Sequence, residues 1–293
     1  MGGETPILFS RCPEMRMKRK LSITRREFVM AASSMGPALA AGSLMFAEPG
    51  AAAWVKLSAA GLPQQSQGRA VQAKPRVLVF DVNQTMLDVG ALRPHFARVF
   101  GDPRALEEWF TLLLQYSMVV TLADSYSDFG TVGRAALEML AATRKVQIPA
   151  EEQTRIMQGV LTLPAHPDIA PNLTRLRAAG FRMVTLTNSS PSAVRSQLQN
   201  AGLTQFFDES ISVEFARRFK PDLAVYRGAA AHLGVQPGEL RLIAAHAWDV
   251  FGAMKAGWHA AFVARNGIPL FPLGPTPDIV GPDMTAVTDS ILA

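Results

Sequence analysis

Short runs of apolar and β-branched residues recur along the chain from about residue 76 onward. They lie at residues 76–82, 181–187, 240–245 and 260–264. A short apolar run bounded by polar or turn-forming residues is typical of a strand that is buried on both faces of a parallel sheet. The pattern therefore predicts four strands of one sheet.

Helical stretches separate the later strands, and each of them ends close to a glycine. The stretches are residues 191–201, 222–233 and 250–256, and the glycines are Gly202, Gly234 and Gly257. Glycine is the preferred residue just beyond a helix C-terminus. Strand and helix in alternation predict right-handed βαβ units, hence an α/β fold with a doubly wound, mostly parallel, Rossmann-like sheet. Ligands of such sheets bind at the carboxyl ends of the strands.

A long insertion separates the first predicted strand from the second. Its pattern is helical at residues 106–120, 131–145 and 151–161. A single crossover between neighbouring strands needs far less chain. We therefore expect a helical cap over the carboxyl edge of the sheet, where a lid excludes water and contacts the substrate.

The first 51 residues have the order of features found in export signals. A basic stretch at residues 16–20 is followed by the pair Arg25 and Arg26, by Phe28, and by a weakly apolar run at 29–47. This order resembles a twin-arginine export signal. The resemblance predicts a periplasmic or otherwise exported protein that meets the twin-arginine export machinery in transit. The protein stays cytoplasmic if the leader is not functional.

Composition and charge narrow the class of protein. With 48% hydrophobic and 18% charged residues, an intrinsically disordered chain is excluded. The single cysteine, Cys12, excludes a disulfide framework and a cysteine-rich zinc site. Of the net charge of +5, residues 1–51 contribute +3. The globular part thus needs no polyanionic partner, and no nucleic acid is expected.

These patterns together predict the organisation of the chain. Residues 1–51 are expected to form the leader and residues 52–75 a polar linker. The α/β core is expected at residues 76–90 and 164–293, with the helical cap at residues 91–163.

Polar residues stand at four points where the predicted strands end or a helix begins. They are Asp81 after the first strand, the segment 187–190 after the second, Lys220 with Pro221 and Asp222 before a helix, and the segment 244–249. A carboxylate that leaves a buried strand is costly unless another group uses it. The sequence therefore predicts a polar site at the carboxyl edge of the sheet.

The order and spacing of these four segments resemble the haloacid dehalogenase superfamily, and specifically its type II L-2-haloacid dehalogenases. The resemblance runs from about residue 76 to residue 267. It implies that Asp81 is a covalent nucleophile, that Lys220 keeps Asp81 ionised, and that Asp249 steers or activates the hydrolytic water. It also implies that Thr187 and Asn188 offer hydroxyl and amide groups to the substrate or to Asp81.

Two departures separate the chain from the phosphatases of this superfamily. Those enzymes usually carry a second aspartate two residues after the nucleophile, where this chain has Asn83, which cannot exchange a proton. They also usually hold Mg²⁺ with an acid four residues before the Asp249 position, where this chain has Ala245. Both departures favour a metal-free reaction at carbon.

Other departures concern the dehalogenases themselves. The family's halide-binding arginine follows a tryptophan in the first cap helix, and Phe110 takes that place after Trp109. Tyr116 matches a family tyrosine, whereas the family's tyrosine two residues past the nucleophile is Asn83 and its fourth-motif asparagine is His246. A departing halide therefore needs another binding site. The candidate residues for it are Asn188, Trp248, His246 and Arg134.

The sequence therefore predicts a hydrolase with an aspartate nucleophile. The favoured reaction converts short 2-haloalkanoic acids to 2-hydroxy acids through an aspartyl ester, with a small-molecule substrate and no cofactor. One alternative is a phosphatase of the same superfamily, which would use Mg²⁺, or another aspartate-nucleophile hydrolase of unknown substrate. A second alternative is a non-catalytic binding protein on the same scaffold. The oligomeric state stays open, with a homodimer among the alternatives.

Overall fold

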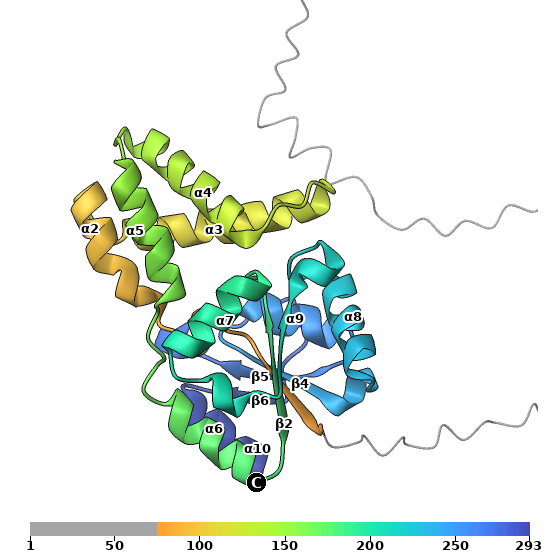
Figure 1. Cartoon of the computed structure of the whole chain (residues 1–293). Helices are drawn as coiled ribbons and strands as arrows, with labels where there is room; N and C mark the ends of the chain where they lie inside the picture. The colour runs from red at the N-terminus through yellow and green to blue at the C-terminus, as the bar shows by residue number, and fades with distance from the viewer. Residues whose placement is uncertain (1–74) are drawn as a thin grey trace, which may run out of the picture. The chain divides into compact units, whose positions relative to one another are not determined.

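One fully parallel sheet of six strands forms the centre of the described part of the chain (Figure 1). The computed structural model describes residues 75–293. The strand order is β3-β2-β1-β4-β5-β6, so the chain starts in the middle of the sheet and winds outward in both directions. The strands are β1 (Val77–Phe80), β2 (Arg182–Thr187), β3 (Glu209–Ser212), β4 (Leu240–Ala244), β5 (His259–Val263) and β6 (Ile279–Gly281).

Helices of the core flank this sheet. Helix α6 packs against α10, and α8 packs against α9. The core helices are α6 (Ile169–Ala178), α7 (Pro191–Asn200), α8 (Leu223–Leu233), α9 (Ala247–Lys255) and α10 (Met284–Leu292). The α/β fold class with a doubly wound parallel sheet is therefore confirmed.

Four further helices lie between β1 and the helix that precedes β2, and we call them the cap. They are α2 (Arg93–Phe100), α3 (Ala105–Leu122), α4 (Phe129–Arg144) and α5 (Ala150–Leu161). Helices α3 and α4 pack tightly, and the indole nitrogen of Trp109 donates a hydrogen bond across them to the carbonyl of Gly133 at 2.9 Å. In Figure 1 the cap helices stand apart from the sheet in the segment coloured orange to green.

The central strand β1 explains why the site forms where it does. All four of its residues are buried, between β2 on one side and β4 on the other. Burying a side chain such as valine, leucine or phenylalanine contributes about 1.5–3 kcal/mol, so this strand is held firmly. Its last residue, Phe80, is level with Thr185 of β2 and Ile243 of β4. The next residue, Asp81, therefore leaves the sheet at a rigid point.

The sequence pattern missed two strands at the edges of the sheet. Strand β3 has the sequence Glu-Ser-Ile-Ser, and β6 has only three residues, one of which is exposed. Strand β3 contains a single apolar residue, and β6 is too short to form a run of the length that marks a buried strand. Short segments of this kind give a weak signal in a search for buried strands.

The predicted leader, 1–51, and nearly all of the predicted linker, 52–75, lie outside the described residues. The domain boundaries stay predictions. Within residues 75–293, no helix combines the length and the apolar character that crossing a bilayer requires.

Candidate active site

Asp81 lies at the centre of a buried group of polar side chains at the carboxyl edge of the sheet. Its Oδ1 accepts a hydrogen bond from Lys220 Nζ at 2.9 Å, and its Oδ2 accepts one from Thr85 Oγ1 at 2.6 Å. His246 Nδ1 lies 3.1 Å from Oδ2. Burial by itself would raise the pKa of Asp81, but the charge of Lys220 and the contacts with His246 and Thr85 outweigh it and hold that pKa well below its usual value. Asp81 is therefore ionised at neutral pH.

Lys220 joins two carboxylates. Its side chain is fully buried, and its three ammonium protons match three acceptors: Asp81 Oδ1 at 2.9 Å, Asp249 Oδ2 at 2.6 Å and the carbonyl of Leu186 at 2.9 Å. Burial disfavours the charged form, yet the charges of Asp249 and Asp81 raise the pKa of Lys220 above its ordinary value. Lys220 therefore stays a cation.

Asp249 faces the protein interior. It lies in the first turn of α9, is completely buried, and has a partner for each carboxylate oxygen. Lys220 Nζ donates to Oδ2, and the hydroxyl of Tyr226 donates to Oδ1 at 2.6 Å. Burial and the nearby charge of Asp81 raise the pKa of Asp249 despite these two partners. Each carboxylate oxygen can accept a second hydrogen bond, so the role of Asp249 in steering water stays a prediction.

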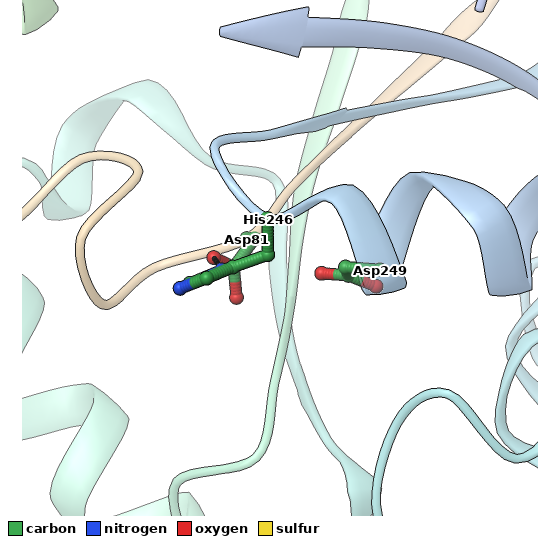
Figure 2. Close-up of side chains that lie close together, drawn as sticks. All are labelled: Asp81, His246 and Asp249. Carbon is green, nitrogen blue, oxygen red and sulfur yellow. Dashed lines mark hydrogen bonds and ion pairs between the residues drawn. The ribbon is translucent and has the colours of Figure 1, made fainter. Parts of the chain in front are cut away.

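His246 lies beside Asp81 at the start of α9 (Figure 2). Its Nδ1 faces Asp81, and its Nε2 lies 2.7 Å from Oε1 of Gln84. The imidazole stacks on Trp248, with ring centres 4.9 Å apart, and on Phe110 of the cap at 6.3 Å. Two of the positions at which this chain departs from the dehalogenases, Phe110 and His246, are therefore in contact.

The segment 187–190, which follows β2, forms hydrogen bonds with backbone groups of the site. Asn188 Oδ1 accepts a hydrogen bond from the backbone nitrogen of Lys220 at 3.1 Å. The hydroxyl of Thr187 accepts one from the backbone nitrogen of Ser189, also at 3.1 Å. Both side chains are buried. Asn188 thus positions Lys220, and the structure records no hydrogen bond from Thr187 or Asn188 to Asp81 within residues 75–293.

Asn83 is part of a separate buried network. Its amide nitrogen donates to Ser189 Oγ at 3.1 Å, and its Oδ1 accepts from Gln197 Nε2 at 2.9 Å. The position two residues after Asp81 therefore ties the loop after β1 to helix α7. It supplies no proton-exchanging group.

The cap contributes one ring, that of Phe110, to the site. Phe110 is buried in α3, and Tyr116 of the same helix is half-buried against the hydrophobic core. Arg134 of α4 is exposed and lines a separate pocket of about 440 Å³ together with Ser190 and neighbouring residues. Arg134 is absent from the group of side chains that contact Asp81.

A small cavity lies beside Gln84. Its volume is about 100 Å³, and its lining includes Gln84 and Ala245 from the core and Phe110 from the cap. Two arginines, Arg93 and Arg265, also line it. The space suits a molecule of a few heavy atoms, and the carboxyl groups of Asp88 and Glu107 line it beside the two guanidinium groups.

Asp81, His246 and Asp249 also form a geometric candidate for a metal centre. One ligand atom of each lies within 4.8 Å of the others. However, the ammonium of Lys220 lies between the two carboxylates, at 2.9 Å from one and 2.6 Å from the other. It already supplies the cation at that point, so a metal ion would have to displace a fully buried lysine.

The sequence reasoning overlooked three residues that shape the site: Thr85, Tyr226 and Gln84. Thr85 ends the loop segment that begins with Asp81, and its hydroxyl also accepts a hydrogen bond from the backbone nitrogen of Ala245 at 2.9 Å. Tyr226 lies in an apolar helical stretch, where nothing in the pattern marks its hydroxyl as functional. Gln84 follows Asn83 in a loop and carries no recognisable motif.

An aspartate held ionised by a buried lysine, at the end of the central strand of a doubly wound sheet, defines a hydrolase of the α/β class with a carboxylate at its reactive centre. Comparison with known families agrees. The family model of haloacid dehalogenase-like hydrolases matches residues 75–257, and the chain belongs to this family.

Curated relatives extend the match beyond the motifs. The chain is 31% identical over 196 residues to (S)-2-haloacid dehalogenase 4A of Burkholderia cepacia, covering 66% of this chain and 85% of the relative. It is 32% identical over 196 residues to (S)-2-haloacid dehalogenase 1 of Pseudomonas sp. strain CBS-3, covering 66% and 86%. A solved structure of L-2-haloacid dehalogenase from Xanthobacter autotrophicus, with chloropropionic acid covalently bound, superposes with a TM-score of 0.70. That pair is 26% identical, and the match covers 75% of this chain and 99% of the other.

Proposed function

We propose that this protein hydrolyses the carbon–halogen bond of short 2-haloalkanoic acids and releases 2-hydroxy acids. The observation that carries the proposal is Asp81 itself, an ionised carboxylate paired with a buried lysine at the carboxyl edge of the sheet. Relatives named as 2-haloacid dehalogenases support the substrate class.

The reaction has two steps. An oxygen of Asp81 attacks C2 of the haloacid, the carbon–halogen bond breaks, and the halide leaves with the bonding electrons. The product of this step is an ester between Asp81 and the alkanoic acid. Water then attacks the carboxyl carbon of Asp81, and cleavage of the ester bond releases the 2-hydroxy acid. The water oxygen thus remains on Asp81.

The surrounding residues serve both steps. Lys220 and Thr85 hold the two oxygens of Asp81 in a fixed orientation, so one face of the carboxylate is presented to the substrate. Lys220 also stabilises the negative charge that develops on the carboxyl group when water adds. Asp249 accepts a hydrogen bond from Lys220 and is itself held by the hydroxyl of Tyr226, which makes Asp249 a positioning residue in this scheme.

The size of the cavity supports a small substrate. Arg265 forms paired contacts of 3.1 Å with Asp168, which leaves it partly neutralised, and Arg93 pairs with Glu107 at the surface. Both guanidinium groups still line the space beside Gln84 and Phe110. Asp88 and Glu107 line the same space, so the cavity carries charges of both signs.

The phosphatase alternative gains no support from the site. Asn83 is held by Ser189 and Gln197, so it neither exchanges protons nor faces Asp81. Ala245 has no side-chain oxygen for a metal ion. The test measures halide release from a panel of 2-haloacids and haloacetates, alongside a phosphatase screen with and without Mg²⁺. Halide release with no phosphate release supports the proposal, and strict Mg²⁺-dependent phosphate release contradicts it.

We further propose that the full chain is exported by the twin-arginine route. The support is the order of basic stretch, arginine pair, Phe28 and apolar run in residues 16–47. A full-length fusion should reach the periplasm, and changing Arg25 and Arg26 to lysine should retain it in the cytoplasm. Cytoplasmic location of the unchanged protein would contradict this assignment.

A further inference from the structure

Arg265 lies just after β5, at the carboxyl edge of the sheet, and contacts the loop that begins with Asp81. Its Nε donates a hydrogen bond to the carbonyl oxygen of Thr85 at 3.0 Å. Only β4 separates β5 from β1 in the sheet, which is why residues 180 positions apart in the sequence meet here. The guanidinium group of Arg265 therefore holds the backbone of the loop that carries the nucleophile.

A carboxylate holds the other end of this guanidinium group. Nη1 and Nη2 of Arg265 donate to the two oxygens of Asp168 at 3.1 Å each, and the backbone nitrogen of Met284 donates to the same carboxylate at 2.8 Å. Partial burial would raise the pKa of Asp168, but the hydrogen bonds from Arg265 and Met284 outweigh it and lower that pKa. A bidentate pair of this kind fixes the plane of an arginine side chain. Because Asp168 precedes α6 and Met284 begins α10, two core helices hold Arg265 against Thr85.

Thr85 connects Arg265 with the nucleophile. Its buried hydroxyl donates to Oδ2 of Asp81 at 2.6 Å and accepts from the backbone nitrogen of Ala245 at 2.9 Å. Both hydrogen bonds depend on direction as well as on distance, so they tolerate only a small shift of the threonine backbone. The orientation of the Asp81 carboxylate therefore depends on where the loop places Thr85.

Other residues of this loop are held by backbone hydrogen bonds. The carbonyl oxygen of Val82 accepts from the backbone nitrogens of Met86 and Leu87 at 2.9 and 3.0 Å, and the carbonyl of Met86 accepts from the backbone nitrogen of His166 at 2.8 Å. These bonds close the turn and join it to the segment that returns from the cap. The bond from Arg265 differs from them, because it ties the turn to the end of β5 and to the starts of two core helices.

We infer that Arg265 is a positioning residue for the nucleophile: it holds Thr85, and the hydroxyl of Thr85 in turn holds the carboxylate of Asp81. The inference rests on the proposed function, because it concerns the attack of Asp81 on the haloacid. In that step an oxygen of Asp81 approaches C2 from the side opposite the halogen, and the halide leaves with the electrons of the carbon–halogen bond. A misplacement of about 1 Å in such an arrangement costs about 10²-fold in rate.

Two substitutions separate this role from the contribution of Arg265 to stability. Positioning requires a hydrogen-bond donor at the place of Nε, whereas the pair with Asp168 stabilises the fold whatever Nε does. The amide nitrogen of glutamine stands at the same place along the side chain as Nε of arginine, and methionine has a methyl group there. Both substitutions remove the pair with Asp168, but only glutamine keeps a donor for the carbonyl of Thr85.

The test compares Arg265→Gln with Arg265→Met in the full-length protein, with 2-chloropropionate as the substrate. In Arg265→Met, kcat and the rate of halide release in a single turnover should fall about tenfold, while KM changes less than about twofold. In Arg265→Gln, both rates should stay within about threefold of wild type, because the donor to Thr85 is retained. Thermal unfolding should show a similar loss of stability in both variants, since both lose the pair with Asp168.

Arg175→Ala is the matched control. Arg175 lies in α6 and pairs with Asp289 of α10 at 2.6 Å, so it also links the two helices that hold Arg265. Its loss should lower the stability and leave kcat and KM unchanged. If either Arg265 variant does not fold, as judged by circular dichroism, both substitutions are made together with Asp168→Asn. This change removes the carboxylate left without its arginine and keeps an acceptor for the backbone nitrogen of Met284.

Two results would overturn the inference while the proposed function stands. One is an equal kcat in Arg265→Gln and Arg265→Met, whether normal or reduced, which would limit Arg265 to its pair with Asp168. The other is a rise in KM with kcat unchanged, which would place Arg265 in substrate binding. Failure of the wild-type protein to release halide from any haloacid would instead overturn the proposed function, and the inference with it.

Discussion

The two sides of the active site differ in the kind of group that each supplies. The core side provides the charged and hydrogen-bonding groups that contact Asp81, namely Lys220, Thr85 and His246. The cap side provides a buried ring, Phe110, which stacks on His246. The reactive charges thus belong to the rigid sheet, whereas the cap lines the substrate space with an apolar wall.

This difference follows from how each region is built. The core groups leave the ends of neighbouring strands, and parallel strands bring such residues together at one edge of the sheet with little freedom. The cap is a set of helices, and its side chain Phe110 contacts His246 at that edge of the sheet. A change on the core side therefore removes a reacting group, while a change on the cap side alters which substrate fits and how its leaving group is received.

The strongest test of the core side is Asp81→Asn. The amide is a poor nucleophile, so we expect haloacid turnover to fall by about 10⁴-fold or more, with the fold retained. Halide release measures the loss. In the wild-type protein, a single turnover in ¹⁸O-water should place the label on Asp81, and near-normal activity of the variant would contradict the covalent scheme.

Removing the lysine tests how the core tolerates its buried charges. Lys220→Met leaves Asp81 and Asp249 facing each other without their cation, so the free energy of unfolding should fall by about 3–5 kcal/mol. Urea unfolding measures this change. Without the ammonium, the folded-state pKa of at least one carboxylate rises above its unfolded value, so stability is lost as pH rises through that pKa. The variant should therefore recover stability relative to wild type as pH is lowered from 7 to 5.

The cap side is tested by Phe110→Arg. A guanidinium at this position offers charge-assisted hydrogen bonds to a departing halide, for which we expect about a tenfold gain in kcat/KM on 2-haloacids. Phe110 is buried against His246 and Trp109, so the variant should also lose about 1–3 kcal/mol of stability. Kinetics and thermal unfolding are measured together, with Phe110→Leu as the uncharged control. A stably folded Phe110→Arg without any gain would show that the apolar wall suits the substrate.

The smallest effect is expected from metal ions. Lys220 supplies the cation between Asp81 and Asp249, so haloacid turnover should change less than twofold on addition of EDTA or Mg²⁺. Dialysis against chelator followed by a halide-release assay measures this. Strict Mg²⁺ dependence would favour phosphoryl transfer. It would also show that a metal ion, and not Lys220 of the core side, supplies the cation at the reactive centre.

Much of the fold was predictable because apolar runs and helical patterns are local features of the sequence. The strands in the middle of the sheet are buried on both faces, so they must be continuous apolar runs, and the sequence displays them at 76–82, 181–187 and 240–245. Helices α3, α4 and α5 follow the predicted helical stretches closely. The edge strands β3 and β6 were missed because their short segments lack such a run.

The site was predictable only in part. Asp81, Lys220 and Asp249 stand at strand ends or helix starts with family-like spacing, and the structure brings them into one group. The place of Asp249 behind Lys220, with the hydroxyl of Tyr226 on its second oxygen, depends on how α8 packs against α9. That packing is a contact between distant segments, and a pattern along the chain does not record it.

The sequence by itself determined the class of this protein, because burial on both faces dictates apolar strands and because the reactive residues must follow those strands. Only the tertiary structure decided what each polar group touches. It placed Phe110 and His246, which lie 136 positions apart in the sequence, against each other, and it turned Asn83 and Asn188 toward structural partners. Hydrogen bonds and ring contacts form over a few ångströms, so they depend on the folded positions of side chains and not on their order along the chain.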